Sequence, residues 1–228
     1  VRCQHRPYVV PAPGALRVTG IHPATLTKPN LPTHYEAIRQ IRAKMIEWSP
    51  AMFLGYNSIS FDETLLRQAL FQTLHPAYLT NTNGNSRGDV MRIAHAVSVY
   101  APNSISIPIG DRERQVFRLE DLATANGFDH QHAHEAMADV EATIHMARIG
   151  KDRAPEVWQR MMRSARKSYV IDHVTRQGAI AHTDFFYGRE YSWLVTYCGE
   201  NPDNDAQLAV FDLWNDPDDY LNLSVGEL

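Results

Sequence analysis

The strongest constraint on the fold is a change of pattern between residues 152 and 168. Before this region, short apolar runs typical of buried strands alternate with apolar residues that recur every three to four positions, the period of a helix. After residue 168, only short strand-like runs remain, separated by Gly, Asn, Asp and Pro. We therefore predict an α/β domain over residues 1–151, a helical connector over 152–167 and the start of a small all-β domain over 168–228.

The first part contains one clear strand candidate and several helix candidates. The apolar run 52–56 suits a buried strand of a parallel sheet, and the proline-rich opening up to Pro32 suits extended chain and turns. We expect a loop over residues 81–88, and Gly127 can end a helix in the left-handed conformation. Helices are predicted at residues 33–48, 62–74, 89–100, 119–125, 134–150 and 155–167, and strand-like runs at 169–171, 193–198 and 208–213.

Charge is unevenly distributed along the 228 residues, whose net charge is −4. Residues 148–167 hold seven basic and two acidic side chains, whereas the last 61 residues hold two basic and eleven acidic ones. A basic stretch can face phosphates, or it can be the solvated face of a helix. The sequence leaves both interpretations open.

The apolar runs and the cysteines exclude several classes of protein. No apolar run approaches the roughly 18 residues of a membrane-spanning helix, and the start lacks the apolar stretch of a signal peptide. Cys3 and Cys198 lie far apart, which argues against a disulfide framework and a cysteine-based zinc site. With 44% hydrophobic residues the chain can bury a sizeable core, so we expect a globular, cytoplasmic protein.

Asp62 is the first residue that suggests chemistry. It precedes Leu65 and Leu66 by three and four positions, so it shares the apolar face of its helix, where a carboxylate needs a partner. One interpretation is a helix cap, in which Asp62 or Ser60 accepts backbone N–H groups. The other is a metal ligand at the end of a buried strand, where open α/β sheets have their active sites.

His134 and Asp139 form a second candidate group at the start of a predicted helix. Five residues along a helix turn by about 140°, so the two side chains converge only if His134 lies in the preceding loop or the first turn. A lone histidine at this place is more often a cap or a surface residue. His130, His132 and His134 also suggest a zinc site, but no cysteine is close to them.

Five segments of the chain together resemble a known family. Residues 55–62 resemble the second exonuclease motif of the DEDD superfamily, and residues 134–139 resemble the third motif of its histidine-bearing subclass. Within this superfamily the chain resembles the exonuclease I family, whose members are specific for single-stranded DNA. The other segments that carry the resemblance are Pro13–Leu16 with Thr19–Ile21, Asn85–Arg87 followed by Asp89, and Phe117–Glu120 leading into Ala125–Gly127.

The resemblance implies an RNase H-like exonuclease domain followed by an SH3-like domain. It also implies hydrolysis of single-stranded DNA from the 3′ end, with release of nucleotides, in DNA repair and recombination. Asp62 and Asp139 would be the metal ligands, His134 the general base, and Arg87 and Arg118 substrate contacts. Two cations about 4 Å apart can activate water and stabilise the leaving oxygen of a phosphodiester. Carboxylate oxygens suit two Mg²⁺ ions, and they suit Mn²⁺ as well.

The resemblance implies single-stranded DNA and a single-stranded DNA-binding protein as partners of a monomeric chain. One departure concerns the family's first motif, an Asp-x-Glu on the first strand, which residues 1–12 do not contain. The two Asp-x-Glu matches, Asp111 with Glu113 and Asp139 with Glu141, lie in a polar loop and in the third motif. We therefore expect a fragment that lacks the first strand and the family's C-terminal helical domain, and that is inactive alone.

Two other functions stay open. One is a non-catalytic remnant that binds single-stranded nucleic acid through Arg87, Arg118 and the basic residues 148–167. The other is a relative in the same superfamily that acts on RNA or proofreads for a polymerase. The strand-rich segment after residue 168 argues against this last function.

Overall fold

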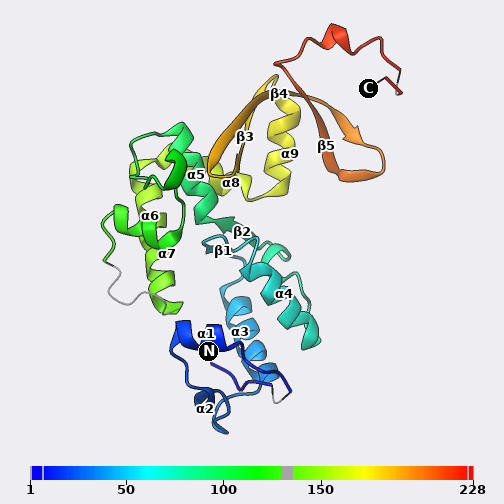
Figure 1. Ribbon diagram of the computed structural model, residues 1–228. Coiled ribbons are helices and arrows are strands. Elements are labelled where there is room, and N and C mark those ends of the chain that lie inside the picture. Colours follow the sequence, from blue (N-terminus) through cyan, green and yellow to red (C-terminus); the bar gives the residue numbers. More distant parts are fainter. Residues whose placement is uncertain (1, 7, 130–135, 225, 228) are drawn as a thin grey trace. The chain divides into compact units, whose positions relative to one another are not determined.

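The computed structural model describes residues 2–6, 8–129, 136–224 and 226–227 as a mixed α/β structure (Figure 1). It contains a two-stranded parallel sheet and a separate three-stranded antiparallel sheet. The chain forms two compact units, one of Val1–Arg92 with Arg118–Ile149 and the other of Ile93–Phe117 with Gly150–Leu228. Helices α5 and α7 contribute residues to both units.

The first unit holds the parallel sheet, in which β1 pairs with β2. The register runs from Met52 opposite Ser86 to Gly55 opposite Asp89. A parallel pair needs a crossover connection, and here α4 supplies it. The elements of this part of the chain are α1 (Pro13–Thr19), α2 (Pro23–Leu26), α3 (His34–Trp48), β1 (Met52–Gly55), α4 (Asp62–Gln72), η1 (Leu79–Asn81), β2 (Ser86–Asp89), α5 (Val90–Tyr100), α6 (Leu119–Ala125) and α7 (Ala136–Arg153).

The buried side chain of Asn85 fixes the start of the β1–β2 pairing. Its Oδ1 accepts a hydrogen bond from the Ala51 N–H at 2.8 Å. Its Nδ2 donates to Ser49 Oγ at 3.0 Å and to the Leu79 carbonyl at 2.8 Å. One amide therefore ties the end of α3 and the turn η1 to the residue that precedes β2.

Helices α3 and α4 bury the apolar residues that recur every three to four positions along them. Ile38 of α3 and Leu70 of α4 form a buried cluster with Leu79, and Leu70 has no exposed surface. Thr33 caps α3 and accepts from the Glu36 N–H, while the Glu36 side chain accepts from the Thr33 N–H. This capping box satisfies two backbone donors at the helix start.

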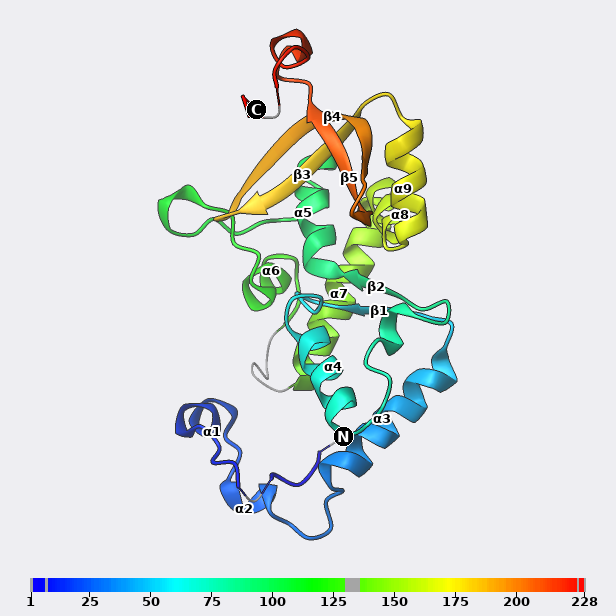
Figure 2. The ribbon, with the colours of Figure 1, turned by 90° about the vertical axis from the view of Figure 1, so that its right-hand side faces the viewer.

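The second unit is built around an antiparallel sheet with the strand order β3–β4–β5 (Figure 2). Phe185 of β3 stacks on His95 of α5, and Phe117 meets both rings edge-on. These ring contacts thus hold the middle of α5 against the sheet. The elements of this unit are η2 (Asp111–Glu113), α8 (Pro155–Ser164), α9 (Lys167–Arg176), β3 (Ile180–Phe186), β4 (Arg189–Asn201), β5 (Asn204–Asp212) and η3 (Pro217–Asp219).

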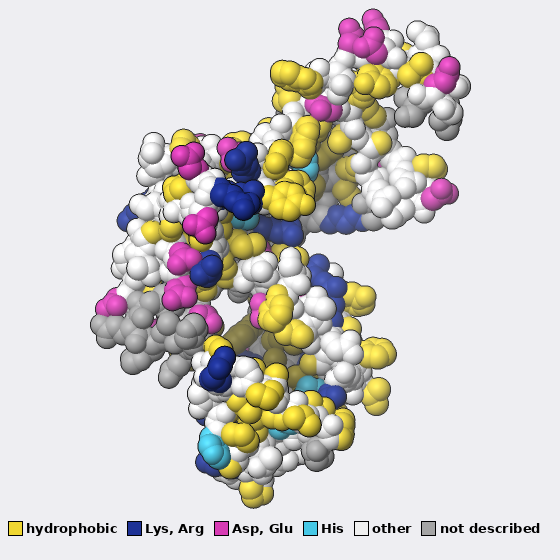
Figure 3. Space-filling model, viewed as in Figure 1, with side chains coloured by type: hydrophobic (Ala, Val, Ile, Leu, Met, Phe, Trp, Pro, Cys, Tyr) yellow, Lys and Arg dark blue, Asp and Glu magenta, His cyan; other side chains and the backbone are white. Residues whose placement is uncertain are grey.

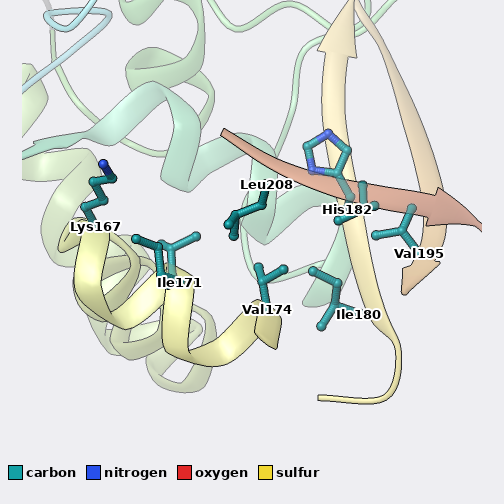
Figure 4. A pocket seen from close by; sticks show the side chains of 9 residues that line it. Lys167, Ile171, Val174, Ile180, His182, Val195 and Leu208 are labelled. Carbon is teal, nitrogen blue, oxygen red and sulfur yellow. The ribbon is translucent and has the colours of Figure 1, made fainter. Parts of the chain in front are cut away.

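An apolar groove of about 310 Å³ lies between α9 and the three strands (Figure 4). Val174 of α9 and Val195 of β4 line it and are buried. The polar residues in its lining are Lys167 and His182, and none of the lining residues is acidic. The groove therefore offers no carboxylate ligand to a divalent cation.

Most of the predicted helices are confirmed close to their expected bounds. The helix predicted at 33–48 is α3, the one predicted at 119–125 is α6, and the one predicted at 155–167 is α8. Gly127 has the expected left-handed conformation, with φ of 87°. Strand β1 lies within the predicted run 52–56, but it is not buried as predicted, because Leu54 is 42% exposed.

Three predictions of local structure are wrong. Residues 169–171 belong to helix α9 because Val170, Ile171 and Val174 pack as one helical stripe against the sheet. Residues 86–88 of the expected loop and Asp89, the expected helix start, form β2, because they pair with β1. The opening contains two short helices, α1 and α2, and each begins with a proline, which is tolerated in the first helical turn.

Charged side chains follow the distribution seen in the sequence. Arg160 and Arg163 of α8 are exposed, so this part of the basic stretch forms a solvated helix face. Acidic side chains gather in the segment after β5 (Figure 3), where Asp216, Asp218 and Asp219 are exposed. Among the helices that the structure describes, none has the length and apolar character needed to cross a membrane.

The buried cluster of the first unit gives a stability prediction. Leu70→Ala should lower the free energy of unfolding by about 2–5 kcal/mol, because it removes a fully buried side chain and leaves a cavity. The neighbouring residue Phe71 is 70% exposed, and Phe71→Ala should change the same quantity by about 0.5 kcal/mol at most. Urea unfolding of the two variants measures both. Equal losses would show that the α3–α4 cluster is not a core.

Candidate active site

The carboxyl ends of β1 and β2 meet at one edge of the parallel sheet, where Gly55 lies opposite Asp89. This edge is the usual place for an active site in open α/β sheets. The loop 56–61 leads from β1 into α4, and Asp62 is the first residue of that helix. Asp62 therefore follows the end of a strand, as the sequence predicts.

The environment of Asp62 differs from the prediction. Its carboxylate is exposed and makes no hydrogen bond or ion pair within the described residues. Phe61 is the N-cap of α4, and no side chain of the described residues caps the helix, so the predicted cap by Asp62 or Ser60 is wrong. Asp62 shares a helix face with Leu66, which packs against the α3–α4 cluster, and with Leu65, which is 56% exposed, but its own carboxylate is exposed and so does not need the internal partner that was predicted. A solvated carboxylate without an internal partner can bind a cation.

Glu63, which the sequence analysis missed, is the buried acidic residue of α4. Thr80 Oγ1 donates to its Oε2 at 2.7 Å, and the same oxygen lies 3.5 Å from Arg87 Nη1 and 4.0 Å from Arg67 Nε. Both arginine nitrogens are buried, and neither has a hydrogen-bond partner among the described residues. The negative charge of Glu63 therefore compensates two guanidinium groups. The spacing of four between Glu63 and Arg67 was the available sequence signal.

The two arginines predicted to contact substrate have different environments. The Arg87 side chain is 23% exposed and is paired with the buried Glu63, so it has a partner inside the protein. The Arg118 side chain is 73% exposed, and its Nη1 lies 3.5 Å from Asp121 Oδ2 on the surface of α6. A surface pair of this kind contributes little to stability, so Arg118 can exchange Asp121 for a phosphate at low cost.

Asp89 is a second buried carboxylate at the sheet edge, with 4% of its surface exposed. Its Oδ1 accepts from the Asn57 N–H at 2.8 Å and from the Met91 N–H at 3.1 Å, and its Oδ2 accepts from the Ile59 N–H at 3.2 Å. Burial and then the nearby Asp89 charge raise the pKa of Tyr56 above its usual value. In the sequence, Asp89 is predicted to begin a helix and follows one of the segments that carry the family resemblance, but its burial at the sheet edge is not predicted.

Asp139 lies in the first turn of α7 and is exposed. His134, like His130 and His132, falls outside the described residues, so its predicted place beside Asp139 stays a prediction. Within the described ranges, no group of three or more His, Cys, Asp or Glu side chains is arranged to hold a metal ion. Asp62 and Asp139 nevertheless have the right chemistry, because hard divalent cations prefer carboxylate oxygens.

Comparison with curated proteins shows similarity along almost the whole chain. Exodeoxyribonuclease I of Haemophilus influenzae is 31% identical over 99% of this chain and 48% of its own length. Exodeoxyribonuclease I of Escherichia coli is 30% identical over 97% of this chain and 47% of its own length. The chain thus spans about half the length of the curated relatives that it matches. No model of a protein family matches the chain.

Solved structures give the same result. E. coli exonuclease I in complex with a dA16 oligonucleotide matches with a TM-score of 0.81 and 28% identity, over 97% of this chain and 48% of that one. A zinc-bound form of E. coli ExoI with single-stranded DNA matches with a TM-score of 0.78 and 28% identity, over 97% of this chain and 48% of that one. An ExoI/SSB-Ct complex matches with a TM-score of 0.76 and 27% identity, over 94% of this chain and 47% of that one. The chain is therefore a homologue of DNA exonucleases. In particular, it is homologous to exodeoxyribonuclease I.

The Glu63 network gives a second prediction. Glu63→Gln keeps the shape of the side chain but leaves Arg67 and Arg87 without a counter-charge, so the free energy of unfolding should fall by about 1–3 kcal/mol. The matched control is Glu47→Gln, because the Glu47 side chain is 64% exposed and pairs with Lys44 on the surface. The control should change stability by about 0.5 kcal/mol at most. If urea unfolding gives the same small loss for both variants, the buried pairs do not stabilise the fold.

Proposed function

We propose that this chain is part of a 3′→5′ exodeoxyribonuclease that hydrolyses single-stranded DNA from the 3′ end and releases nucleotides, in DNA repair and recombination. The observation that carries the proposal is the match to exodeoxyribonuclease I over 99% of the chain. Asp62 also supports it, because its exposed carboxylate follows a parallel strand, has no partner among the described residues, and is a ligand of the kind that metal-dependent hydrolysis needs.

The domain assignment belongs to this proposal. Residues 1–151 would form an RNase H-like exonuclease domain without its first strand, and the parallel pair β1–β2 supports this part. Residues 152–167 would form a helical connector, which contains α8. Residues 168–228 would start an SH3-like domain, and the antiparallel sheet β3–β4–β5 supports that part.

The proposed metal ligands are Asp62 and Asp139, each an exposed carboxylate in the first turn of a helix. Bound Mg²⁺, in two sites, would activate water and stabilise the leaving oxygen, and Mn²⁺ would serve as well. The zinc-bound E. coli structure supports a divalent cation in a protein of this type. His134 would be the general base, since an imidazole can take a proton from water near neutral pH.

The proposed substrate contacts are Arg118 and Arg87. Arg118 has the better position, because its guanidinium is exposed and its acidic partner lies on the surface. Arg87 would have to share its charge between Glu63 and a phosphate. The proposed partners are single-stranded DNA and a single-stranded DNA-binding protein, and the solved complexes of E. coli exonuclease I support both. We expect the chain to act as a monomer.

A second candidate is a chain that binds single-stranded nucleic acid without cleaving it. The specific observation in its favour is that the described residues contain no converging group of three metal ligands. Two carboxylates leave a two-metal site short of ligands, because each cation needs several oxygens. Cleavage and binding assays separate the two candidates.

The cleavage assay compares three proteins on a 3′-labelled single strand with Mg²⁺. The chain as given should release almost no nucleotide, and a chain extended by a strand that carries Asp-x-Glu should release it readily. Asp139→Asn in the extended chain should reduce the rate by about 10² or more, because a metal ligand is lost. Asp172→Asn, at an exposed surface ion pair, is the control and should have no effect. Rapid cleavage by the unextended chain, or by the Asp139 variant, would refute the proposed site.

A binding assay tests the role of Arg118. Arg118→Ala should weaken binding to single-stranded DNA and reduce the slope of log K against log salt by about 0.7, the value for one phosphate contact. The control is Arg176→Ala, because Arg176 is equally exposed and forms a similar surface pair with Asp172. Fluorescence anisotropy at several salt concentrations measures the slopes. If the slope for Arg118→Ala is identical to that of the unsubstituted chain, Arg118 does not contact a DNA phosphate.

A further inference from the structure

Asp89 connects three backbone segments at the edge of the parallel sheet. It is the last residue of β2, lies opposite the last residue of β1 and precedes the first residue of α5. Its two carboxylate oxygens accept three backbone N–H groups, those of Asn57, Ile59 and Met91. The Met91 contact is an ordinary helix cap, whereas the other two reach across to the loop after β1.

This loop determines where Asp62 lies. Asn57 has a φ of 53°, a left-handed conformation that needs local support in a residue with a side chain. The Ser58 carbonyl accepts from the Glu63 N–H at 2.9 Å, which joins the loop to the first turn of α4. Asp89 therefore holds residues 57 and 59, and the loop in turn holds residues 62 and 63.

We propose that Asp89 is a positioning residue for Asp62: its buried carboxylate fixes the loop 57–59 and thereby the place from which Asp62 meets a divalent cation. The inference rests on the proposed function, because it takes Asp62 as a metal ligand. Asp89 itself stays inside the protein, since its oxygens are occupied by backbone donors and 4% of its surface is exposed. Residues that orient metal ligands in this way affect metal affinity without touching the metal.

The chemistry requires a carboxylate at this position. An asparagine whose oxygen takes the place of Oδ1 can still accept from Met91, which caps α5, and from Asn57, but its NH₂ group is a donor and would face the donor N–H of Ile59. Serine also caps helices, but its single hydroxyl cannot reach both loop amides and Met91 at once. Asp89→Asn therefore keeps the helix cap and loses the Ile59 contact, and Asp89→Ser keeps the cap and cannot keep both loop contacts.

Hydrogen exchange of the 228-residue chain tests the contacts themselves. In Asp89→Asn, the amide of Ile59 should exchange about tenfold faster, because it loses its acceptor, whereas the amide of Asn57 shares its acceptor oxygen with Met91 and should keep its rate. The amide of Ile38 in the α3–α4 core should exchange at its original rate, which shows that the fold is intact. If the Asn variant does not fold, Asp89→Ser provides the same comparison. Unchanged exchange at the Ile59 amide in a folded variant would overturn the proposal.

Mn²⁺ binding tests the consequence for Asp62. The measurement is the Mn²⁺ concentration that half-broadens the amide NMR signals of residues 61–64. Both Asp62→Asn and Asp89→Asn should raise this concentration about tenfold or more. Leu70→Ala is the control for a purely structural loss, because it destabilises the same unit without touching the loop, and it should leave the concentration unchanged.

The outcomes separate the inference from the proposed function. If Asp62→Asn weakens Mn²⁺ binding and Asp89→Asn does not, Asp62 remains a ligand and the positioning role of Asp89 is refuted. If Asp62→Asn has no effect, the metal assignment of Asp62 fails, and the inference fails with it. If Leu70→Ala weakens binding as much as Asp89→Asn, the effect of Asp89 is only loss of stability, and the proposal is overturned.

Discussion

The parallel pairing of β1 with β2 is the constraint on which the candidate site depends. It places the last residues of both strands, Gly55 and Asp89, at the same edge of the sheet. Because parallel strands need a long crossover, the chain must leave β1 through a loop and a helix before it returns as β2. That crossover contains Asp62 and Glu63, so the topology alone brings them into the neighbourhood of the strand ends.

Three acidic residues at this edge have three different environments. Asp62 is solvated and has no partner within the described residues, which leaves its charge for an external cation. Glu63 is buried against two arginines, and Asp89 is buried against backbone N–H groups. Burial of a charge requires compensation, and the fold supplies guanidinium groups in one case and peptide dipoles in the other. The Asp62 carboxylate thus faces solvent, whereas the carboxylates of Glu63 and Asp89 bind groups of the protein itself.

The helices with strong local signals could be predicted from the sequence. Helix α3 has a capping box and a regular apolar stripe, and α6 ends at a glycine with positive φ. Strand β2 could not be predicted, because the residues 86–89 have little strand propensity and pair only through their partner β1. The burial of Glu63 instead of Asp62 depends on Arg87, which is distant in sequence, so local periodicity could not reveal it.

The pairing of Glu63 with Arg87 has a consequence for how relatives of this chain vary. Positions 63 and 87 should change together, because a neutral residue at one leaves a buried charge at the other. Position 62 has no such partner in the described part of the chain, so under the proposed metal site its variation should follow that of Asp139 and not that of its immediate neighbour. Two acidic residues that are adjacent in sequence would then carry separate evolutionary signatures, one of folding and one of catalysis.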